Sequence, residues 1–223
     1  MNSNAEKVAR FGMLTALALV LGWLDRAIPV TWFLSGAVPG IKLGLANTVL
    51  LYAVYLMDWK GCVLLMLAKV FLSGFMFGSM SAILYSLSGG VLSLAVMLLV
   101  KRRPRLGALV IAVLAAASDV MLLLRHPHPR GQMLWCMILI ALACGAAVAA
   151  FVVIGRRPEY AVLGTSLAGA VAHNVGQILA AMMLMQSVYV GAYLPYLLVV
   201  SVFTGCATGA AGAGVLRVMK DRV

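Results

Sequence analysis

The stretch YAVLGTSLAGAVAHNVGQILAAMMLM, residues 160–185, decides the fold of this chain. It carries no Lys, Arg, Asp or Glu over its whole length. A bilayer core about 30 Å thick needs about 20 mainly apolar residues for each helix that crosses it. We therefore interpret residues 160–185 as a membrane-spanning helix, and the other long apolar runs of the chain as further spans.

The composition of the whole chain agrees with this interpretation. Of its 223 residues, 64% are hydrophobic and 10% are charged, and the mean hydropathy is +1.07. Soluble domains carry about 25% charged residues. The composition therefore excludes a nucleic-acid binder, a secreted disulfide scaffold and a soluble metabolic enzyme. The cysteines fall inside apolar runs, where we expect them to pack as small hydrophobic side chains; they are Cys62, Cys136, Cys144 and Cys206.

The apolar runs divide the chain into about eight segments of spanning length. We therefore predict an all-α integral membrane protein, a bundle of about eight transmembrane helices. The predicted spans are residues 8–24, 41–57, 61–77, 83–100, 106–124, 132–154, 160–185 and 194–216. The second and third spans are short, so we expect them to tilt little or to be partly re-entrant.

The formal net charge of +11 has a topological explanation, because the Lys and Arg residues cluster between the apolar runs. Cytoplasmic loops of membrane proteins carry an excess of Lys and Arg. Placing the N-terminus in the cytoplasm puts most of the seventeen cations on the inner side. We predict a multi-pass protein of the bacterial cytoplasmic membrane with both termini cytoplasmic.

Lys69 is the most costly residue of the predicted bundle. It lies eight residues into span 61–77, which is about 12 Å deep at 1.5 Å per residue. A lysine near the bilayer centre costs about 2.5–3.5 kcal/mol on insertion scales. We expect Lys69 to face the bundle interior and to meet either Asp119 or an anionic group of a ligand. Snorkelling along the helix is the alternative, and the depth of Lys69 weakens it.

His173, Asn174 and Gln177 place three polar side chains in the middle of span 160–185. His173 and Gln177 are four residues apart and so share one helix face. Polar side chains of this kind commonly bridge helices by hydrogen bonds in a membrane. Contact with a substrate is the other interpretation of this cluster.

The segment before the second span combines apolar residues with helix breakers. Residues 25–40 are too apolar for a free loop, so we interpret them as an outer lid or re-entrant loop, or as an interfacial connector anchored by Trp32 and Phe33. The second span then opens with Lys42 at its outer end and Asn47 deeper. Lys42 is expected to anchor the helix end, to meet Asp25 or to contact an anionic ligand.

Small residues line one or more faces of the first span, at Gly12, Ala16, Ala18 and Gly22. Small side chains let helices approach closely in a membrane. Packing within the chain is the simpler explanation for such a face, and a partner subunit is the alternative.

The chain lacks the motifs of the enzymes that would use its charges. There is no G-x-x-x-x-G-K-[ST] phosphate loop, and the six acidic residues lie far apart in the sequence, so no local cluster holds Mg²⁺. Two histidines beside Arg125 and Arg130 make a weak metal signal. We therefore expect no metal, no cofactor and no catalysis by this chain alone.

Several motifs resemble the Gx transporter family, whose members are labelled heptaprenyl diphosphate synthase component I. They are PGIKLGLANTV at 39–49, DWK at 58–60, LYSLSGG at 84–90, GAVAHNVGQ at 169–177 and YLP at 193–195. The likeness covers residues 8–101 and 160–218 of a single membrane domain. Residues 102–159 are then an inserted two-helix hairpin.

The resemblance implies two different functions. Relatives look like the S components of energy-coupling-factor transporters, which bind a small molecule while separate ATPase and transmembrane coupling subunits drive its transport. Gly12, Ala16, Ala18 and Gly22 would then dock on the coupling subunit. The label instead implies an accessory role in heptaprenyl diphosphate and quinone synthesis with an isoprenoid ligand, because the aspartate-rich motifs of prenyl synthases are missing.

We predict a substrate-binding subunit of the first kind. Its polar lining would consist of Lys42, Asn47, Lys69, His173, Asn174 and Gln177. The two lysines favour an anionic or carboxylate-bearing ligand in a cavity of low dielectric constant. A structural scaffold for a membrane assembly is a third hypothesis, in which the polar cluster only packs helices together.

Overall fold

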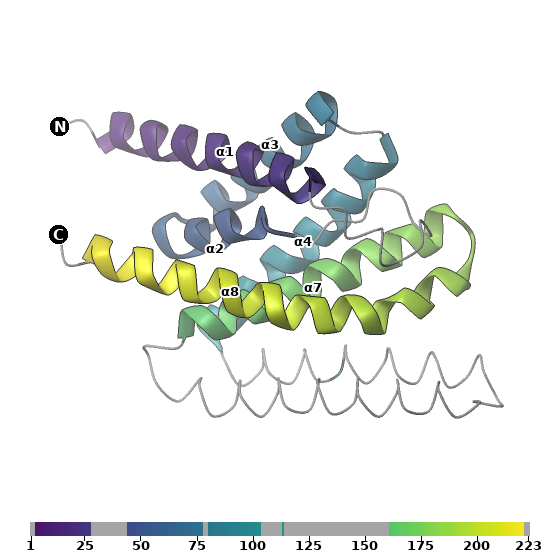
Figure 1. Ribbon diagram of the computed structural model, residues 1–223. Helices are drawn as coiled ribbons and strands as arrows, with labels where there is room; N and C mark the ends of the chain where they lie inside the picture. The colour runs from purple at the N-terminus through teal and green to yellow at the C-terminus, as the bar shows by residue number, and fades with distance from the viewer. Residues whose placement is uncertain (1–2, 28–43, 78–79, 104–112, 114–160, 221–223) are drawn as a thin grey trace.

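All regular secondary structure in the described part of the chain is helical in the computed structural model, which describes residues 3–27, 44–77, 80–103, 113 and 161–220. Within these residues there are six α-helices, one 3-10 helix and no strand, which confirms the predicted fold class for this part of the chain (Figure 1). The elements are α1 (Ser3–Ala27), α2 (Asn47–Leu56), α3 (Trp59–Phe77), α4 (Met80–Arg102), α7 (Ala161–Leu184), η3 (Val188–Tyr193) and α8 (Leu194–Lys220).

Five of these helices are long and apolar enough to cross a membrane, namely α1, α3, α4, α7 and α8. Each coincides with a span predicted from the sequence. The predicted spans 106–124 and 132–154, and with them Asp119, lie outside the described residues. The total of eight spans and the inserted hairpin therefore stay predictions.

The second predicted span is shorter than the sequence suggested. We expected a helix over residues 41–57, but α2 begins at Asn47. Gly44 has a φ of +85°, a left-handed conformation that interrupts a right-handed helix. The backbone then turns, with the Asn47 N–H donating to the Gly44 carbonyl at 2.8 Å. The ten residues of α2 span about 15 Å, half of a bilayer core.

Helix α7 forms the centre of the bundle. In the most apolar stretch of α7, 78% of the residues are buried. The corresponding fraction is 22% in α1 and 28% in α8. Its neighbours α4 and α8 approach closely at glycines. A Cβ on Gly176 would lie 2.8 Å from the Gly89 Cα of α4, and a Cβ on Gly205 of α8 would lie 2.9 Å from the Leu167 Cα of α7. These small residues therefore pack helices of the same chain together.

Hydrogen bonds from hydroxyl groups reinforce these close approaches. Ser88 and Ser93 of α4 donate to the carbonyls of Gly176 and Gly169 of α7, at 2.7 and 2.9 Å. Ser166 of α7 donates to the Gly205 carbonyl of α8 at 2.9 Å. Interhelical hydrogen bonds of this kind stabilise membrane bundles by about 0.6 kcal/mol each on average.

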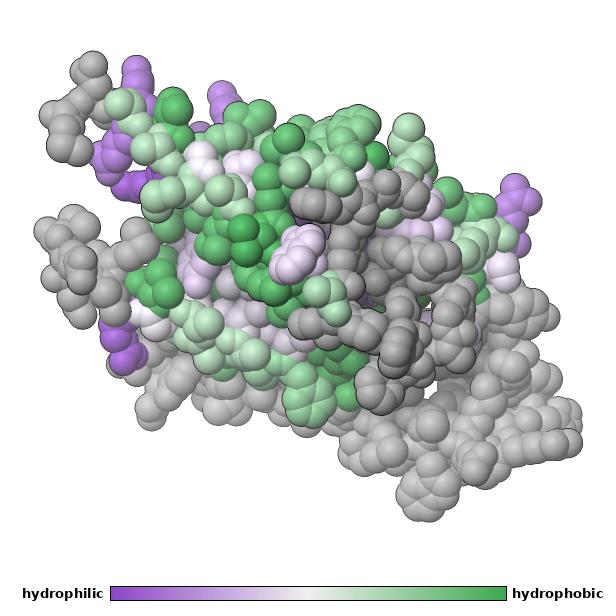
Figure 2. Space-filling model, turned by 45° about the horizontal axis from the view of Figure 1, so that its top comes forward, coloured by the Kyte–Doolittle hydropathy of each residue, from purple (hydrophilic) through white to green (hydrophobic). Residues whose placement is uncertain are grey.

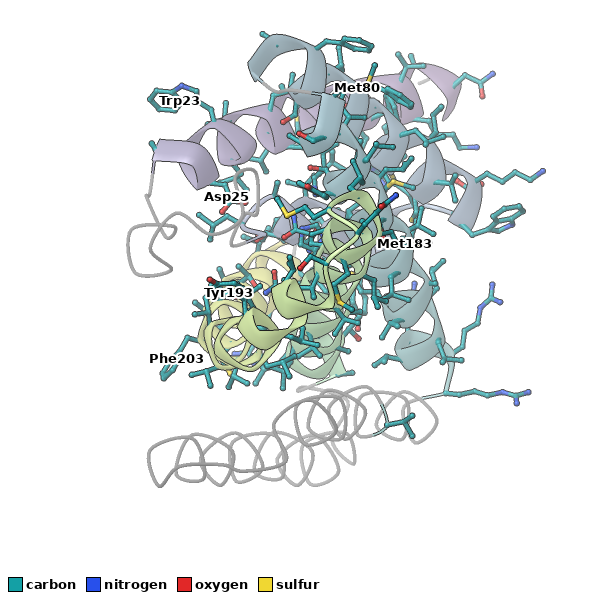
Figure 3. All side chains as sticks on the ribbon, turned by 90° about the vertical axis from the view of Figure 1, so that its right-hand side faces the viewer. Trp23, Asp25, Met80, Met183, Tyr193 and Phe203 are labelled. Carbon is teal, nitrogen blue, oxygen red and sulfur yellow. The ribbon has the colours of Figure 1, made fainter. Side chains whose placement is uncertain are left out.

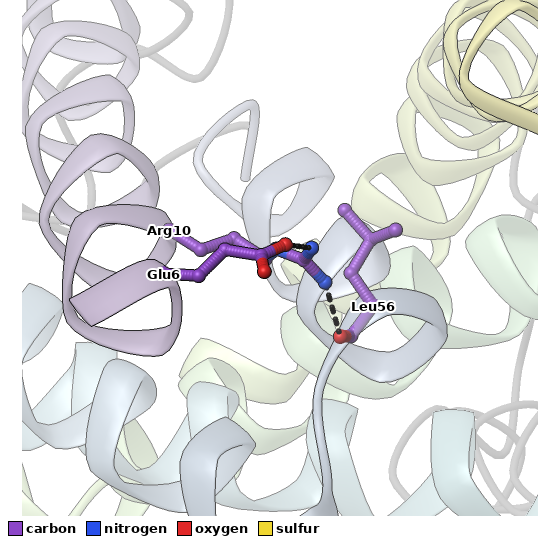
Figure 4. A network of polar contacts seen from close by, with 3 residues as sticks. All are labelled: Glu6, Arg10 and Leu56. Carbon is purple, nitrogen blue, oxygen red and sulfur yellow. Dashed lines mark hydrogen bonds and ion pairs between the residues drawn. The ribbon is translucent and has the colours of Figure 1, made fainter. Parts of the chain in front are cut away.

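One end of the bundle gathers basic residues, and we call it the basic end. The start of α1 and the end of α8 both lie at this end (Figure 1). Arg10 pairs with Glu6 at 2.6 Å and donates to the Leu56 carbonyl at 3.5 Å (Figure 4). The exposed cations Lys7, Lys60, Lys101, Arg102, Arg103 and Arg217 lie near helix termini, and Lys101, like Arg10, donates to a carbonyl near the end of α2. The orientation of the termini relative to a membrane stays a prediction.

Large apolar side chains cover much of the surface between the ends of the bundle. Hydrophobic residues dominate the face seen in Figure 2, and hydrophilic ones gather mainly at its edges. Trp23 of α1 and Phe203 of α8 point outward from the bundle (Figure 3) and are 54% and 72% exposed. A surface of this kind needs an apolar solvent, so the described helices are those of a membrane protein.

Candidate functional site

A small polar cavity lies inside the bundle, between α1, α3, α4, α7 and the turn that precedes α2. Its volume is about 20 Å³, which is room for a single water molecule. Its lining combines small and apolar residues with charged and hydroxyl side chains. These residues are Ala18, Gly22, Asp25, Gly44, Ala46, Lys69, Val70, Ser73, Ser86 and His173.

Asp25 supplies the acidic wall of the cavity from the last turns of α1. It is 4% exposed, and its Oδ2 accepts a hydrogen bond from the Gly44 N–H at 2.9 Å. Figure 3 shows Asp25 directed into the bundle, whereas Trp23, two residues earlier, points outward. The end of an α-helix carries a partial negative charge that disfavours a carboxylate. The position of Asp25 is therefore not explained by the stability of α1.

Lys69 supplies the basic wall from the middle of α3. It is 8% exposed, and its Nζ donates to the Asn47 Oδ1 at 3.0 Å. Asn47 is the first residue of α2 and is itself 4% exposed. Its Nδ2 has no hydrogen-bond acceptor among the described residues. The pair confirms that Lys69 faces inward, as its depth in the span predicted, and it leaves one buried donor beside the cavity.

His173 supplies the third wall from the middle of α7. Its ring nitrogen Nε2 lies 3.0 Å from the Gln177 Nε2. An amide nitrogen is a donor only, so with this amide orientation the His173 Nε2 accepts and a neutral ring carries its proton on Nδ1. Gln177 is completely buried and does not line the cavity. It therefore positions the imidazole.

Two glycines make room for the imidazole ring. A Cβ on Gly89 of α4 would stand 2.7 Å from the His173 Nδ1 and 2.8 Å from the His173 carbonyl oxygen. A Cβ on Gly44 would stand 3.1 Å from the His173 Cδ2. Both distances are shorter than ordinary carbon contacts, so the ring fits because neither position carries a side chain.

Asn174 faces away from the cavity. Its Nδ2 donates to the Ser201 Oγ at 2.6 Å and to the Leu197 carbonyl at 3.3 Å, both on α8. Neighbouring residues of a helix point about 100° apart, so His173 lines the cavity while Asn174 is directed towards α8. The structure gives Asn174 the bridging contact that the sequence left as one of two interpretations.

The structure thus brings together part of the predicted polar lining. Lys69 and His173 line the cavity, Asn47 binds Lys69, and Gln177 binds His173. Lys42 lies outside the described residues.

Asp25, Ser73 and Ser86 line the cavity but were not predicted to be part of the site. An acidic residue directly after an apolar run is a signal that could have identified Asp25.

The small residues of α1 divide between two faces. Ala18 and Gly22 are buried and line the cavity, and a Cβ on Gly22 would stand 3.5 Å from the Ser73 Oγ. Gly12 and Ala16 are exposed, and nothing lies within 4 Å of a Cβ placed on Gly12. Of these four residues of α1, Gly12 and Ala16 are the ones that lie on an exposed face.

The geometry suits binding of a polar group. A cation, a carboxylate, an imidazole and two hydroxyl side chains converge on one cavity, with apolar walls from Ala18, Ala46 and Val70. Among the described residues, no three His, Cys, Asp or Glu side chains come close enough to hold a metal ion. Convergent polar groups in an apolar cavity are typical of small-molecule sites.

Comparison with known proteins gives a family for the chain. A sequence model of the family described as heptaprenyl diphosphate synthase component I matches residues 14–125 and 120–215. These matches cover most of the chain, which therefore belongs to this family. Neither the curated proteins nor the solved structures gave a match.

Proposed function

We propose that this member of the heptaprenyl diphosphate synthase component I family is the substrate-binding membrane subunit of a small-molecule transporter. The observation that carries the proposal is the burial of Lys69, Asp25 and His173 around one cavity between membrane-length helices. Ionisable groups inside a membrane are costly and are typical of substrate or ion pathways. The sequence motifs resemble the Gx transporter family, whose relatives look like S components of energy-coupling-factor transporters, and this expectation favours the same function.

The ligand is a small polar molecule with an anionic group. Lys69 attracts negative charge, and Lys42 is expected to add to this attraction at the outer end of the site. Coulomb attraction is stronger in such a cavity than in water because the effective dielectric constant is lower. The cavity of about 20 Å³ is too small for a metabolite, so binding requires α1 and the Gly44 turn to separate.

Partner subunits supply the energy in this proposal. Separate ATPase chains and a transmembrane coupling subunit move the ligand, and the chain itself binds no nucleotide. The exposed Gly12 and Ala16 face of α1 is the surface proposed for docking. The basic end, which carries the start of α1 and the end of α8, lies on the cytoplasmic side of the bacterial membrane.

An accessory role in heptaprenyl diphosphate and quinone synthesis is the second candidate. The family description favours it, and the same lysine could hold the diphosphate of an isoprenoid. The chain would then deliver or retain a lipid for a soluble prenyl synthase. A pure scaffold is a third candidate, which would need only the interhelical contacts such as that of Asn174 with Ser201.

Native mass spectrometry of the tagged full chain, extracted from its own membranes in mild detergent, tests the three candidates. Recovery of two ATPase chains, a coupling subunit and a released polar metabolite supports the transporter. Recovery of a prenyl synthase or of polyprenyl lipid without an ATPase contradicts the transporter and supports the accessory role. Recovery of other membrane subunits without any small molecule supports the scaffold.

A further inference from the structure

We propose that the Asp25 carboxylate is a built-in competitor of the ligand. In the structure described above it takes the position that an anionic oxygen group of the ligand, a carboxylate or a phosphate, would occupy beside Lys69 at the start of α2. The inference rests on the proposed function because it concerns the same cavity. It goes further by naming the chemical group that is recognised and the side chain that excludes it.

The first step is the set of donors around the start of α2. The Gly44 N–H, the Asn47 Nδ2 and the Lys69 Nζ all lie at this point of the fold. Asn47 Nδ2 has no acceptor among the described residues and lies 3.3 Å from where a Cβ on Gly44, a lining residue of the cavity, would stand. A donor that is buried without an acceptor is costly. An anionic oxygen at this point would satisfy it.

The second step is the electrostatic field of the α2 helix dipole. The N-terminus of an α-helix carries a partial positive charge, which favours anions and disfavours cations. α2 is ten residues long and begins at Asn47, the residue that binds Lys69. The helix terminus and the lysine therefore repel each other, and a negative charge between them relieves this repulsion. Discontinuous helices of many transporters meet anionic substrate groups in this way.

The third step is that a carboxylate of the chain already occupies part of this place. Asp25 accepts the hydrogen bond of the Gly44 N–H at 2.9 Å and lines the cavity together with Lys69. The space left is about 20 Å³, enough for one water. A ligand carboxylate or phosphate does not fit into this space beside Asp25. Its negative charge would also be repelled by that of the Asp25 carboxylate. The ligand therefore binds as Asp25 withdraws with the end of α1.

The test compares the affinities of the full chain and of Asp25→Asn in detergent at constant ionic strength. The probes are acetate, inorganic phosphate and farnesyl diphosphate. Asparagine keeps an acceptor for the Gly44 N–H and removes the charge, so Asp25→Asn should bind at least one probe about tenfold to a hundredfold more tightly. Asp58→Asn, an exposed carboxylate at the start of α3, should change nothing. Adding Lys69→Met should abolish the gain.

The probes also separate the two sources of the anionic group. Tighter binding of acetate or phosphate supports the proposal with a water-soluble ligand, and tighter binding of farnesyl diphosphate alone supports it with a lipid head group. Unchanged or weaker binding of all three probes by Asp25→Asn, or no binding at all, overturns the proposal. Asp25→Ser should shift affinity in the same direction, which guards against a folding defect of one variant.

The proposed transporter function is tested by a separate measurement, the native mass spectrometry of co-purifying subunits. If ATPase and coupling subunits co-purify but Asp25→Asn binds no probe more tightly, the competitor role fails and the transporter survives. If Asp25→Asn binds more tightly but a prenyl synthase co-purifies in place of an ATPase, the competitor role survives and the transporter fails.

Discussion

Lys69 and Lys101 hold opposite ends of the same short helix, and their environments differ. Lys101 donates to the Val54 carbonyl near the end of α2 at 2.6 Å, and its Nζ lies 5.1 Å from the centre of the Tyr55 ring. A cation there is favoured by the helix dipole and stays exposed to water. Lys69 is buried at the start of α2, where the dipole disfavours a cation.

The difference separates a lysine that stabilises the end of α2 from one that the proposed function places in the ligand site. Lys101 and Arg10 satisfy carbonyl groups that the end of α2 leaves open. Lys69 is buried, and its ammonium group donates to a side chain, that of Asn47. An apolar residue at this position would pack without any electrostatic cost. In the proposed function an anionic ligand offsets the cost of burying Lys69, whereas the contacts of Lys101 need no ligand.

The largest effect is expected from replacing Lys69. Lys69→Met keeps most of the apolar stem of the side chain and removes the charge, so binding of the anionic ligand should fall by more than about a hundredfold. Equilibrium binding of the metabolite released in native mass spectrometry measures this loss, with Lys60→Met, an exposed lysine of the basic end, as the matched control. Equal affinity of Lys69→Met and the control would remove Lys69 from the site.

The next effect concerns the packing behind the cavity. In Gly176→Ala the new Cβ would meet backbone atoms of Ser88 and Gly89 at 2.8 Å. Backbone atoms cannot turn aside, so we expect a loss of about 1–3 kcal/mol of stability. Thermal unfolding in detergent measures it against Gly12→Ala, which meets nothing within 4 Å. A melting temperature as high as that of Gly12→Ala would contradict the close approach of α4 and α7.

Asn174→Ala should separate packing from binding. It removes the hydrogen bond to Ser201 of α8, and a lost buried hydrogen bond costs about 1 kcal/mol, more if the partner stays unsatisfied. Ligand affinity should stay within about twofold, because Asn174 does not reach the cavity. Both quantities are measured on one preparation, by thermal unfolding and by equilibrium binding. A large loss of affinity would place Asn174 in the site after all.

The smallest effect is expected at the basic end. Lys101→Met removes the contact with the Val54 carbonyl and should lower stability by about 0.3–1 kcal/mol. Ligand affinity should not change, because Lys101 lies at the other end of α2. The stability loss should shrink with added salt if charge is its main source. A loss of ligand affinity as large as that of Lys69→Met would contradict the difference in role between the two lysines.

Part of the site could be predicted from the sequence because depth and helical spacing are local properties. The depth of Lys69 in its span indicated an inward side chain, and the four-residue spacing of His173 and Gln177 indicated a shared face. The place of Asp25 could not be predicted in this way. Its neighbours in the fold come from α3, α4, α7 and the turn before α2, and no local pattern connects these segments.

The predicted start of the second span, at residue 41, was wrong for a related reason, since α2 begins at Asn47. A run such as PGIKLGLANTV is apolar enough for a helix over its whole length, and glycine is tolerated in membrane helices. The interruption at Gly44 depends on contacts made after folding, namely the hydrogen bond to Asp25 and the fit against the His173 ring. These contacts join residues that are far apart in the sequence, so local composition cannot predict them.

The sequence by itself determined that the described segments are membrane helices. Apolar runs of spanning length must satisfy their own backbone groups in lipid, and a helix does so without any partner. Which polar side chains share a cavity was decided only by the tertiary structure. The direction of each side chain is fixed by its helix, but the rotation and neighbours of that helix come from packing, which brings Asp25 to Lys69 and turns Asn174 towards α8.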